Sequence, residues 1–406
     1  MSGSRAFLFR LNLIGIALLV MGCCLPAHAQ RVTQVDGTID VGGGLNDYPT
    51  NTIASESSQW ESFYNVSPGV TISSRTARST FTLGYGFGWN YYGSEFARSA
   101  TSHSVSLSAS RQLSSRWTMQ ISDSYSRTND LYTYYALRGV PIEEDVIVVY
   151  FYPVTTNTSI GTNSLTANFD RALSPRETLS FSAGHSMARY GQSENTLIGV
   201  SDLQTITANA TYTRRLNERT SWNVAYNGSY FSFQKFNSAI STAVTVGLSS
   251  EVAKGTTVNV SAGPSRVKNL NFAGSNNTLV ASLSIAKTIK ENNVHASISN
   301  NNATATGVGS VSNTRTLTAG ISRTLGRRVD VFADFSAFDG AGVAGNPFRT
   351  RGTSATANMG FKLAKNLSIQ GGLQYQRYTQ PSPYAFSQRR LFVSLRYSHP
   401  NLLRSH

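Results

Sequence analysis

The residues of this chain that could carry catalysis or bind a metal are few and isolated. Beyond residue 30 the histidines are His103, His185, His295, His399 and His406. No Gly-x-Ser-x-Gly motif accompanies them, and no His or Cys group has the spacing of a metal site. We therefore expect no catalytic residue, no metal and no cofactor, and we interpret these histidines as structural or interfacial.

Arginines, in contrast, recur in a fixed pattern. The sequence Arg-x-Leu-x-x-Arg occurs four times, and each copy separates two runs of alternating polar and apolar residues. Its arginines are Arg111, Arg116, Arg171, Arg176, Arg214, Arg219, Arg323 and Arg328. Because every copy joins two alternating runs, the pattern predicts a basic tight turn that one architecture uses repeatedly.

The first 29 residues have the layout of a secretory signal peptide. Arg5 and Arg10 precede the apolar stretch LNLIGIALLVMGCCLP, and an Ala-His-Ala cleavage pattern follows it. A membrane anchor fits less well because the stretch is short, and lipoprotein processing at Cys23 is a second alternative. Cleavage after Ala29 would remove Cys23 and Cys24, so the mature chain would have no disulfide.

The composition after the signal argues against ordinary soluble domains. Charged residues make up only 14% of the chain, and the mature part holds 33 Lys and Arg against 21 Asp and Glu, a net charge of +12. We do not expect nucleic-acid binding from a basic chain that is exported. No apolar run after residue 30 approaches the roughly 20 residues of a transmembrane helix.

Alternation with a period of two runs through the mature chain. In residues 102–113, Val105, Leu107 and Ala109 alternate with serines, which is a strand pattern and not a helix pattern. Eighteen such segments are expected: 37–46, 66–74, 78–91, 102–113, 116–128, 162–173, 177–190, 203–214, 219–233, 239–251, 256–266, 277–289, 293–301, 314–325, 328–338, 353–363, 367–378 and 388–398.

The connections between these segments alternate between tight turns and longer polar loops, with a repeat near 40 residues. A propeller blade of that length would need four short strands, and a solenoid would need continuous apolar positions for stacking. Two long strands per repeat, with short turns at one end and long loops at the other, instead predict an all-β, closed antiparallel transmembrane β-barrel. The expected number is 18 strands, with 16 or 20 as alternatives.

The faces of the strands favour a barrel over a soluble sandwich. The polar face is Ser, Thr, Asn and Gly with few charges, which suits a wet lumen better than a soluble surface. The apolar face would point to lipid, with Leu283 and Ile285 as examples. Aromatic residues near segment ends would form interface girdles, namely Trp89, Tyr91, Trp117, Tyr190, Trp222, Tyr375, Tyr378 and Tyr397.

Residues 30–398 resemble Gram-negative outer-membrane β-barrels of the porin-like type, including barrels associated with exopolysaccharide export. The resemblance is one of repeated architecture, and RLFVSLRYS near the C-terminus only partly meets the family's aromatic last strand, because the tail 399–406 follows it. It implies the bacterial outer membrane, with both termini periplasmic. It also implies outer-membrane lipids, lipopolysaccharide, the barrel assembly machinery and polysaccharide export components as partners.

Two groups of charges could act within such a barrel. Glu143, Glu144 and Asp145 could form a constriction loop opposite wall cations such as Arg390, Arg396 or Lys362, or the segment 140–154 could be a hairpin standing above the membrane. The eight turn arginines could form a periplasmic vestibule that gathers anions, or could anchor the barrel to lipid headgroups.

The function expected from these features is a channel for hydrophilic solutes, with saccharide or exopolysaccharide passage as the specific form. Barrels of about 16–18 strands normally leave an aqueous channel. A non-transport scaffold or surface-display barrel is the alternative. A TonB-dependent transporter is disfavoured because strands begin soon after the signal and leave no room for a plug domain.

Overall fold

The computed structural model describes residues 32–49, 58–93, 98–129, 149–150, 159–190, 202–234, 238–270, 275–306, 310–342, 349–379 and 385–405. Every regular element in these ranges is a β-strand. Among the described residues there is no helix with the length and apolarity needed to cross a membrane.

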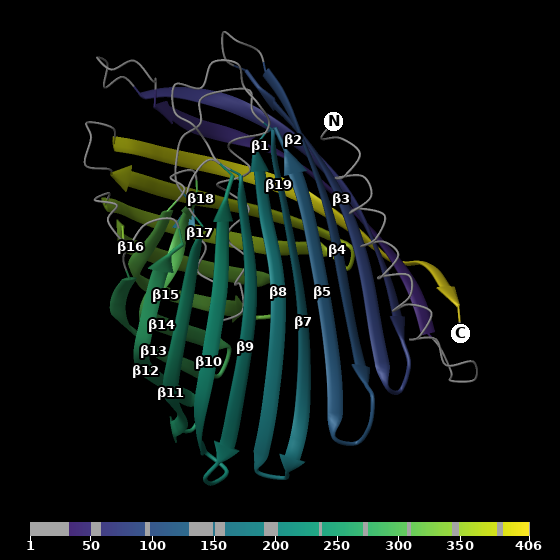
Figure 1. Cartoon of the computed structure of the whole chain (residues 1–406). Coiled ribbons are helices and arrows are strands. Elements are labelled where there is room, and N and C mark those ends of the chain that lie inside the picture. The colour runs from purple at the N-terminus through teal and green to yellow at the C-terminus, as the bar shows by residue number, and fades with distance from the viewer. Residues whose placement is uncertain are drawn as a thin grey trace, which may run out of the picture.

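The strands follow one another along the chain, and all of them except β6 are long (Figure 1). They are β1 (Val32–Pro49), β2 (Ser58–Arg75), β3 (Ser79–Tyr92), β4 (Arg98–Gln112), β5 (Trp117–Thr128), β6 (Val149–Tyr150), β7 (Ile160–Ser174), β8 (Glu177–Tyr190), β9 (Leu203–Arg215), β10 (Thr220–Phe233), β11 (Ala239–Ala253), β12 (Thr256–Asn269), β13 (Ser275–Ile289), β14 (Asn292–Thr306), β15 (Ser310–Leu325), β16 (Val329–Gly342), β17 (Arg349–Ala364), β18 (Leu367–Thr379) and β19 (Ala385–Ser405).

The sheet closes on itself. Each long strand pairs antiparallel with its neighbours in sequence, and β1 pairs with both β2 and β19. Of the 19 strands, β6 has two residues and lies outside this succession, so 18 strands form the wall. Lumenal side chains reinforce the seam, where Arg396 donates to Asp40 at 2.7 Å and Gln388 donates to Asn46 at 2.9 Å. The predicted 18-stranded antiparallel barrel is confirmed.

Large apolar side chains lie on the outer face of this wall. Leu283 is 46% exposed and Ile285 is 45% exposed, whereas Ser284 between them accepts a hydrogen bond from Asn259 on the other face. The same alternation continues around most of the barrel and makes an apolar belt, which is interrupted on β5 and β7, where Asp123 accepts a hydrogen bond from Asn163 at 2.8 Å. A closed sheet suits lipid because every backbone group along a strand is paired with a neighbouring strand.

The last strand differs from the sequence expectation at its end. β19 continues to Ser405, so the last strand takes in most of the residues 399–406 that were expected to form a tail. The side chains of Tyr190 and Tyr378, expected in the outer girdles, lie outside the described part of the structure.

The Arg-x-Leu-x-x-Arg copies are tight turns, as predicted, and the residue after the leucine explains why. Ser114 Oγ accepts hydrogen bonds from the backbone N–H groups of Arg116 and Trp117, each at 3.2 Å. Asn217 Oδ1 accepts hydrogen bonds from the backbone N–H groups of Arg219 and Thr220, each at 2.8 Å. Short polar side chains of this kind stabilise turns by replacing a backbone acceptor.

In the fourth copy of this motif a glycine takes the same position. Gly326 has a backbone φ of 63°, a conformation that residues other than glycine, asparagine and aspartate rarely adopt. The turn is therefore made by backbone conformation where the other copies make it with a side-chain oxygen.

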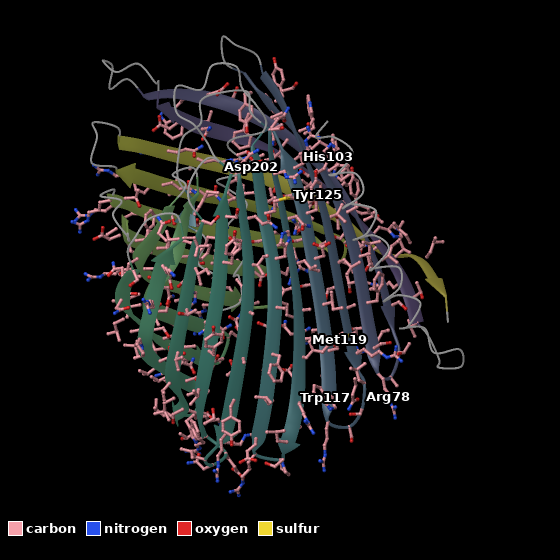
Figure 2. The ribbon with its side chains drawn as sticks, viewed as in Figure 1. Arg78, His103, Trp117, Met119, Tyr125 and Asp202 are labelled. Carbon is pink, nitrogen blue, oxygen red and sulfur yellow. The ribbon has the colours of Figure 1, made fainter. Side chains whose placement is uncertain are left out.

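The start of β1 and the end of β19 lie at the edge of the barrel that carries these turns. Val32 at the start of β1 pairs with Arg75, and Ser405 at the end of β19 pairs with Thr33. Figure 2 shows the arrangement of the two edges, with Arg78 and Trp117 near the turns and Asp202 and His103 near the long connections.

Candidate functional site: the barrel lumen

Small hydroxyl and amide side chains line most of the lumen. Because β-strand side chains alternate between faces, the residues between the outer apolar positions point inward. Many of them bond to each other across neighbouring strands. Examples are Ser126 with Thr162 at 2.7 Å, Ser261 with Ser282 at 2.7 Å, Ser297 with Thr318 at 2.6 Å and Ser336 with Ser354 at 2.7 Å. The lining offers many weak hydrogen-bonding groups and little charge.

Charge in the middle of the lumen gathers on one side, from β14 through β19 to β1. His295 on β14 and Asp334 on β16 reach across β15, with His295 Nε2 3.2 Å from an Asp334 carboxylate oxygen. They meet above Gly320, where an added Cβ would overlap both side chains. A glycine at this position therefore allows a His–Asp contact over an intervening strand.

The three wall cations expected to face the acidic loop do lie in the lumenal register. Two of them already contact acids of the wall: Lys362 Nζ is 3.4 Å from Asp330, and Arg396 binds both oxygens of Asp40. Arg390 lies over the Phe63 ring, 4.1 Å from its centroid. The charged strip is thus largely balanced within the wall.

The lumen is packed at the edge of the long connections. Seven buried apolar residues form one cluster there: Ala188, Leu203, Phe231, Phe233, Ala239, Val267 and Val311. A second cluster, across the mouth, joins Phe63, Tyr92 and Ala100 with Phe392 against it. Buried apolar side chains therefore line both of these parts of the long-connection mouth.

One hairpin bends into this mouth. Pairing between β13 and β14 stops at Ala281 and Asn300, although β14 continues its pairing with β15. Asn302 Nδ2 then lies 2.7 Å from Ser265 Oγ on β12 and 3.4 Å from Ser241 Oγ on β11. Contacts with strands two and three positions away require the end of the β14–β15 hairpin to fold over their lumenal face.

Sequence reasoning missed this bend. The alternation in residues 293–301 predicts only a straight strand, and the residue that makes the new contacts is a single asparagine. Val311, which joins the apolar cluster in the mouth, preceded the expected start of its strand at residue 314. Three asparagines in a row, 300–302, were the available signal, because amides inside a strand need partners beyond the ladder.

The connection between β5 and β7 also reaches this place. Its short strand β6 pairs in parallel with β14, matching Val149 to Ala305 and Tyr150 to Thr306. Many wall strands separate β14 from β5 and β7 in either direction around the barrel. The chain at β6 therefore lies on the opposite side of the mouth from its own anchoring strands. Glu143, Glu144 and Asp145 lie outside the described residues.

The first arginine of each turn motif belongs to the outer face. Arg111, Arg171, Arg214 and Arg323 share the register of outward apolar residues on their strands. The Arg171 guanidinium lies 5.2 Å from the centre of the Trp117 ring, and Arg214 lies 3.8 Å from Glu177. The second arginines, Arg116, Arg176, Arg219 and Arg328, lie in the turns or next to them.

Histidines divide between the two faces. His295 is lumenal, whereas His103 lies outward, where its Nδ1 is 3.0 Å from Tyr85 Oη. His185 is also outward and 2.8 Å from the Gln204 amide. The described part of the chain contains no group of three or more His, Cys, Asp or Glu side chains placed to hold a metal ion.

Comparisons with known proteins find likeness in overall structure only. No protein-family model matches the chain, and no curated protein is significantly similar to it. OccK7 (OpdD) of Pseudomonas aeruginosa is 10% identical with a TM-score of 0.48, covering 91% of this chain and 99% of its own. OccAB4 of Acinetobacter baumannii is 8% identical with a TM-score of 0.47, covering 93% and 100%. The PfeA ferric enterobactin receptor mutant of P. aeruginosa is 9% identical with a TM-score of 0.46, covering 92% and 82%.

Proposed function

We propose that the protein is an outer-membrane channel for hydrophilic solutes. The observation that carries the proposal is the opposition of the two faces of one closed wall. Leucine, isoleucine and valine lie outside, and hydrogen-bonded serine, threonine and asparagine lie inside. An apolar exterior with a polar interior is what a water-filled barrel in a bilayer needs. The bend of the β14–β15 hairpin and the position of β6 support a constriction at one mouth.

Saccharides are the proposed solutes, including the chains of an exopolysaccharide on their way out. A lining of hydroxyls and amides matches sugar hydroxyls without a single strong binding group, which favours movement over retention. Liposome swelling tests this directly. Proteoliposomes in iso-osmotic maltose should swell faster than vesicles without protein, and equal rates would reject sugar passage.

The proposed orientation places the tight turns and both termini in the periplasm and the long connections outside. Cysteines introduced at Ser115 and Asn217 should stay unlabelled by an impermeant maleimide on intact cells. Cysteines at Asn276 and at Ser193, which lies outside the described residues, should label. Lysed cells provide the control, because all four sites should then react. Labelling of Ser115→Cys and Asn276→Cys alike on intact cells would contradict the orientation.

A non-transport scaffold is a second candidate because of the packed mouth. Phe231, Phe233 and Val311 are each at most 6% exposed although they lie in the lumenal register or at the inward bend. A mouth that is packed throughout would leave a barrel for display or assembly and no path for solutes. Electrical conductance separates the two functions, since a closed scaffold passes no current.

The turn arginines are proposed either to gather anions or to anchor the barrel. Reversing the charge of their side chains distinguishes these two roles. In the variant with Arg116, Arg176, Arg219 and Arg328 changed to Glu, a basic vestibule predicts a shift of selectivity towards cations. Salt should weaken the wild-type preference because exposed charges are screened within roughly 8–10 Å. Reversal potentials across a salt gradient measure this. An unchanged reversal potential with a lower folding yield would leave only anchoring to headgroups.

A further inference from the structure

Four arginines form a group on the outer face of the barrel, at the long-connection edge. Arg315 on β15, Arg349 and Arg351 on β17, and Arg377 on β18 occupy outward positions, with Asp339 of β16 among them. Arg315 pairs across to Asp339, and Asp339 pairs across to Arg351. Adjacent strands are about 4.8 Å apart, so the row from β15 to β18 spans about 14 Å, the scale of a lipid headgroup with more than one phosphate.

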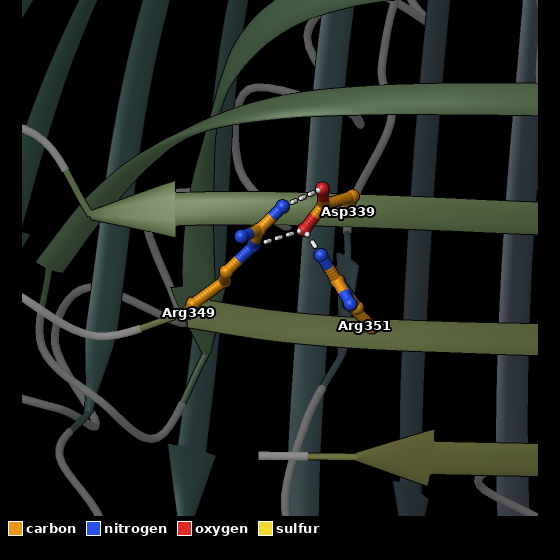
Figure 3. Close-up of polar contacts among 3 residues, drawn as sticks. All are labelled: Asp339, Arg349 and Arg351. Carbon is orange, nitrogen blue, oxygen red and sulfur yellow. Dashed lines mark hydrogen bonds and ion pairs between the residues drawn. The ribbon is translucent and has the colours of Figure 1, made fainter. Parts of the chain in front are cut away.

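Asp339 fixes the direction of two of these side chains (Figure 3). Arg349 donates from Nε to Oδ1 at 2.9 Å and from Nη2 to Oδ2 at 2.6 Å, while Arg351 Nε lies 3.3 Å from Oδ1. Both guanidinium groups remain more than half exposed, at 53% and 59% for the side chains. One carboxylate therefore orients two cations without neutralising the group, which keeps a charge of about +3.

The group lies just beyond the apolar belt. Towards the tight-turn edge, the outer face of β15 carries Leu317, which is 45% exposed. The outer face of β16 carries Phe335 in the same direction from Asp339, and Phe335 is 41% exposed. In the same direction from Arg377, the outer face of β18 carries Leu373, which is 45% exposed. Charged side chains directly beyond a lipid-facing belt lie at the depth of the lipid headgroups.

We propose that this arginine group binds the phosphates of lipid A, the phosphorylated acylated disaccharide that anchors lipopolysaccharide in the outer leaflet. Guanidinium groups bind phosphate oxygens in pairs of parallel hydrogen bonds, and the group offers several such donors on one flat face. Because the apolar belt continues directly below it, the acyl chains of the same lipid would cover Leu317 and Phe335. The proposal uses the outward orientation of the long connections, but it does not depend on whether the lumen conducts.

Binding can be measured on the full barrel refolded in detergent without lipopolysaccharide. Native mass spectrometry counts bound molecules while purified bisphosphorylated lipid A is titrated, and the quadruple variant R315Q/R349Q/R351Q/R377Q is compared with wild type. The variant loses four positive charges near a headgroup and leaves the group at about −1, so it should bind at least about tenfold more weakly. The double variant R315Q/R377Q, which keeps both bonds to Asp339, should show an intermediate loss.

Matched controls separate this site from general attraction to a basic protein. The variant R127Q/R189Q/R266Q/K268Q removes four outward cations near the same edge of other strands and should bind lipid A as wild type does. Dephosphorylated lipid A should bind weakly to every variant, and inorganic phosphate at the same concentration should not displace bound lipid A.

Three results would overturn the proposal. They are equal binding by wild type and the double variant, equal binding of phosphorylated and dephosphorylated lipid, or displacement by inorganic phosphate, which would indicate a site for free anions. Heat-dependent migration on gels confirms that each variant is folded before binding is measured. Channel activity in lipid A-free bilayers is a separate readout, so loss of the proposed channel function would not be mistaken for loss of this site.

Discussion

Leu283→Arg should lower the free energy of unfolding by roughly 2–4 kcal/mol, the cost measured for an arginine facing lipid near the middle of a barrel. Leu283 is 46% exposed on the outer face of β13, and its cross-strand neighbours on that face are Val260 and Ile298. All of these surroundings are apolar, so the guanidinium would have to reach the interface or distort the bilayer. Urea-dependent unfolding from phospholipid vesicles, followed by tryptophan fluorescence, measures the change.

Ser284→Arg is the matched control, one residue away on the same strand. Ser284 accepts a hydrogen bond from Asn259 on the lumenal face, where a long cation can extend into water. We expect a change of less than about 1 kcal/mol, as for most solvent-exposed substitutions. Equal losses for the two variants would mean that the faces of β13 are not assigned correctly, and with them the apolar belt.

Removing the segment that contains β6 should raise the conductance of single channels severalfold. β6 pairs with the end of β14, on the far side of the mouth from β5 and β7. The current through an aqueous pore depends mainly on its narrowest section, and loops folded into a barrel set that section. A variant in which residues 140–154 are replaced by a short Gly-Ser linker should therefore conduct more, with steps of a uniform new size.

Shortening another long connection provides the comparison. Residues 191–201 join β8 to β9, and replacing them with a linker of the same kind should leave the conductance near that of wild type. If both replacements change the conductance equally, general loosening of the mouth explains the result. If neither does, the segment 140–154 does not form a constriction.

The wall of the barrel could be predicted from the sequence because it depends on patterns and contacts between residues that are close in sequence. The alternation of Val105, Leu107 and Ala109 with serines fixes a strand with two different faces, whatever the neighbouring strand is. The tight turns could be predicted for the same reason, since Ser114 and Asn217 act on backbone groups within three residues.

Features of the lumen depend on contacts between distant strands, and these could not be predicted. Asn302 bonds Ser265, 37 residues away, only because its hairpin bends inward. His295 and Asp334 meet because Gly320 on the strand between them has no side chain, and none of the three residues signals the others in sequence. Alternation gives the face of a residue but not its neighbours around the barrel.

The arginine group on the outer face was missed for a related reason. Arg349 and Arg351 follow a long connection, where charged residues are common, and Asp339 precedes it. Only the register of β16 with β17 brings the three side chains together. The turn arginines can be recognised in the sequence because they repeat, whereas this group occurs once.

Single-channel recording in planar bilayers tests the central claim most directly. Refolded wild-type barrel, added to one side of a bilayer in potassium chloride, should produce discrete current steps that scale with salt concentration, as ions crossing a hydroxyl-lined lumen would. We expect a uniform step that becomes larger when residues 140–154 are replaced. Insertion of folded barrel, verified by protease protection in the same lipid, without current in either form would contradict a solute channel and leave the scaffold.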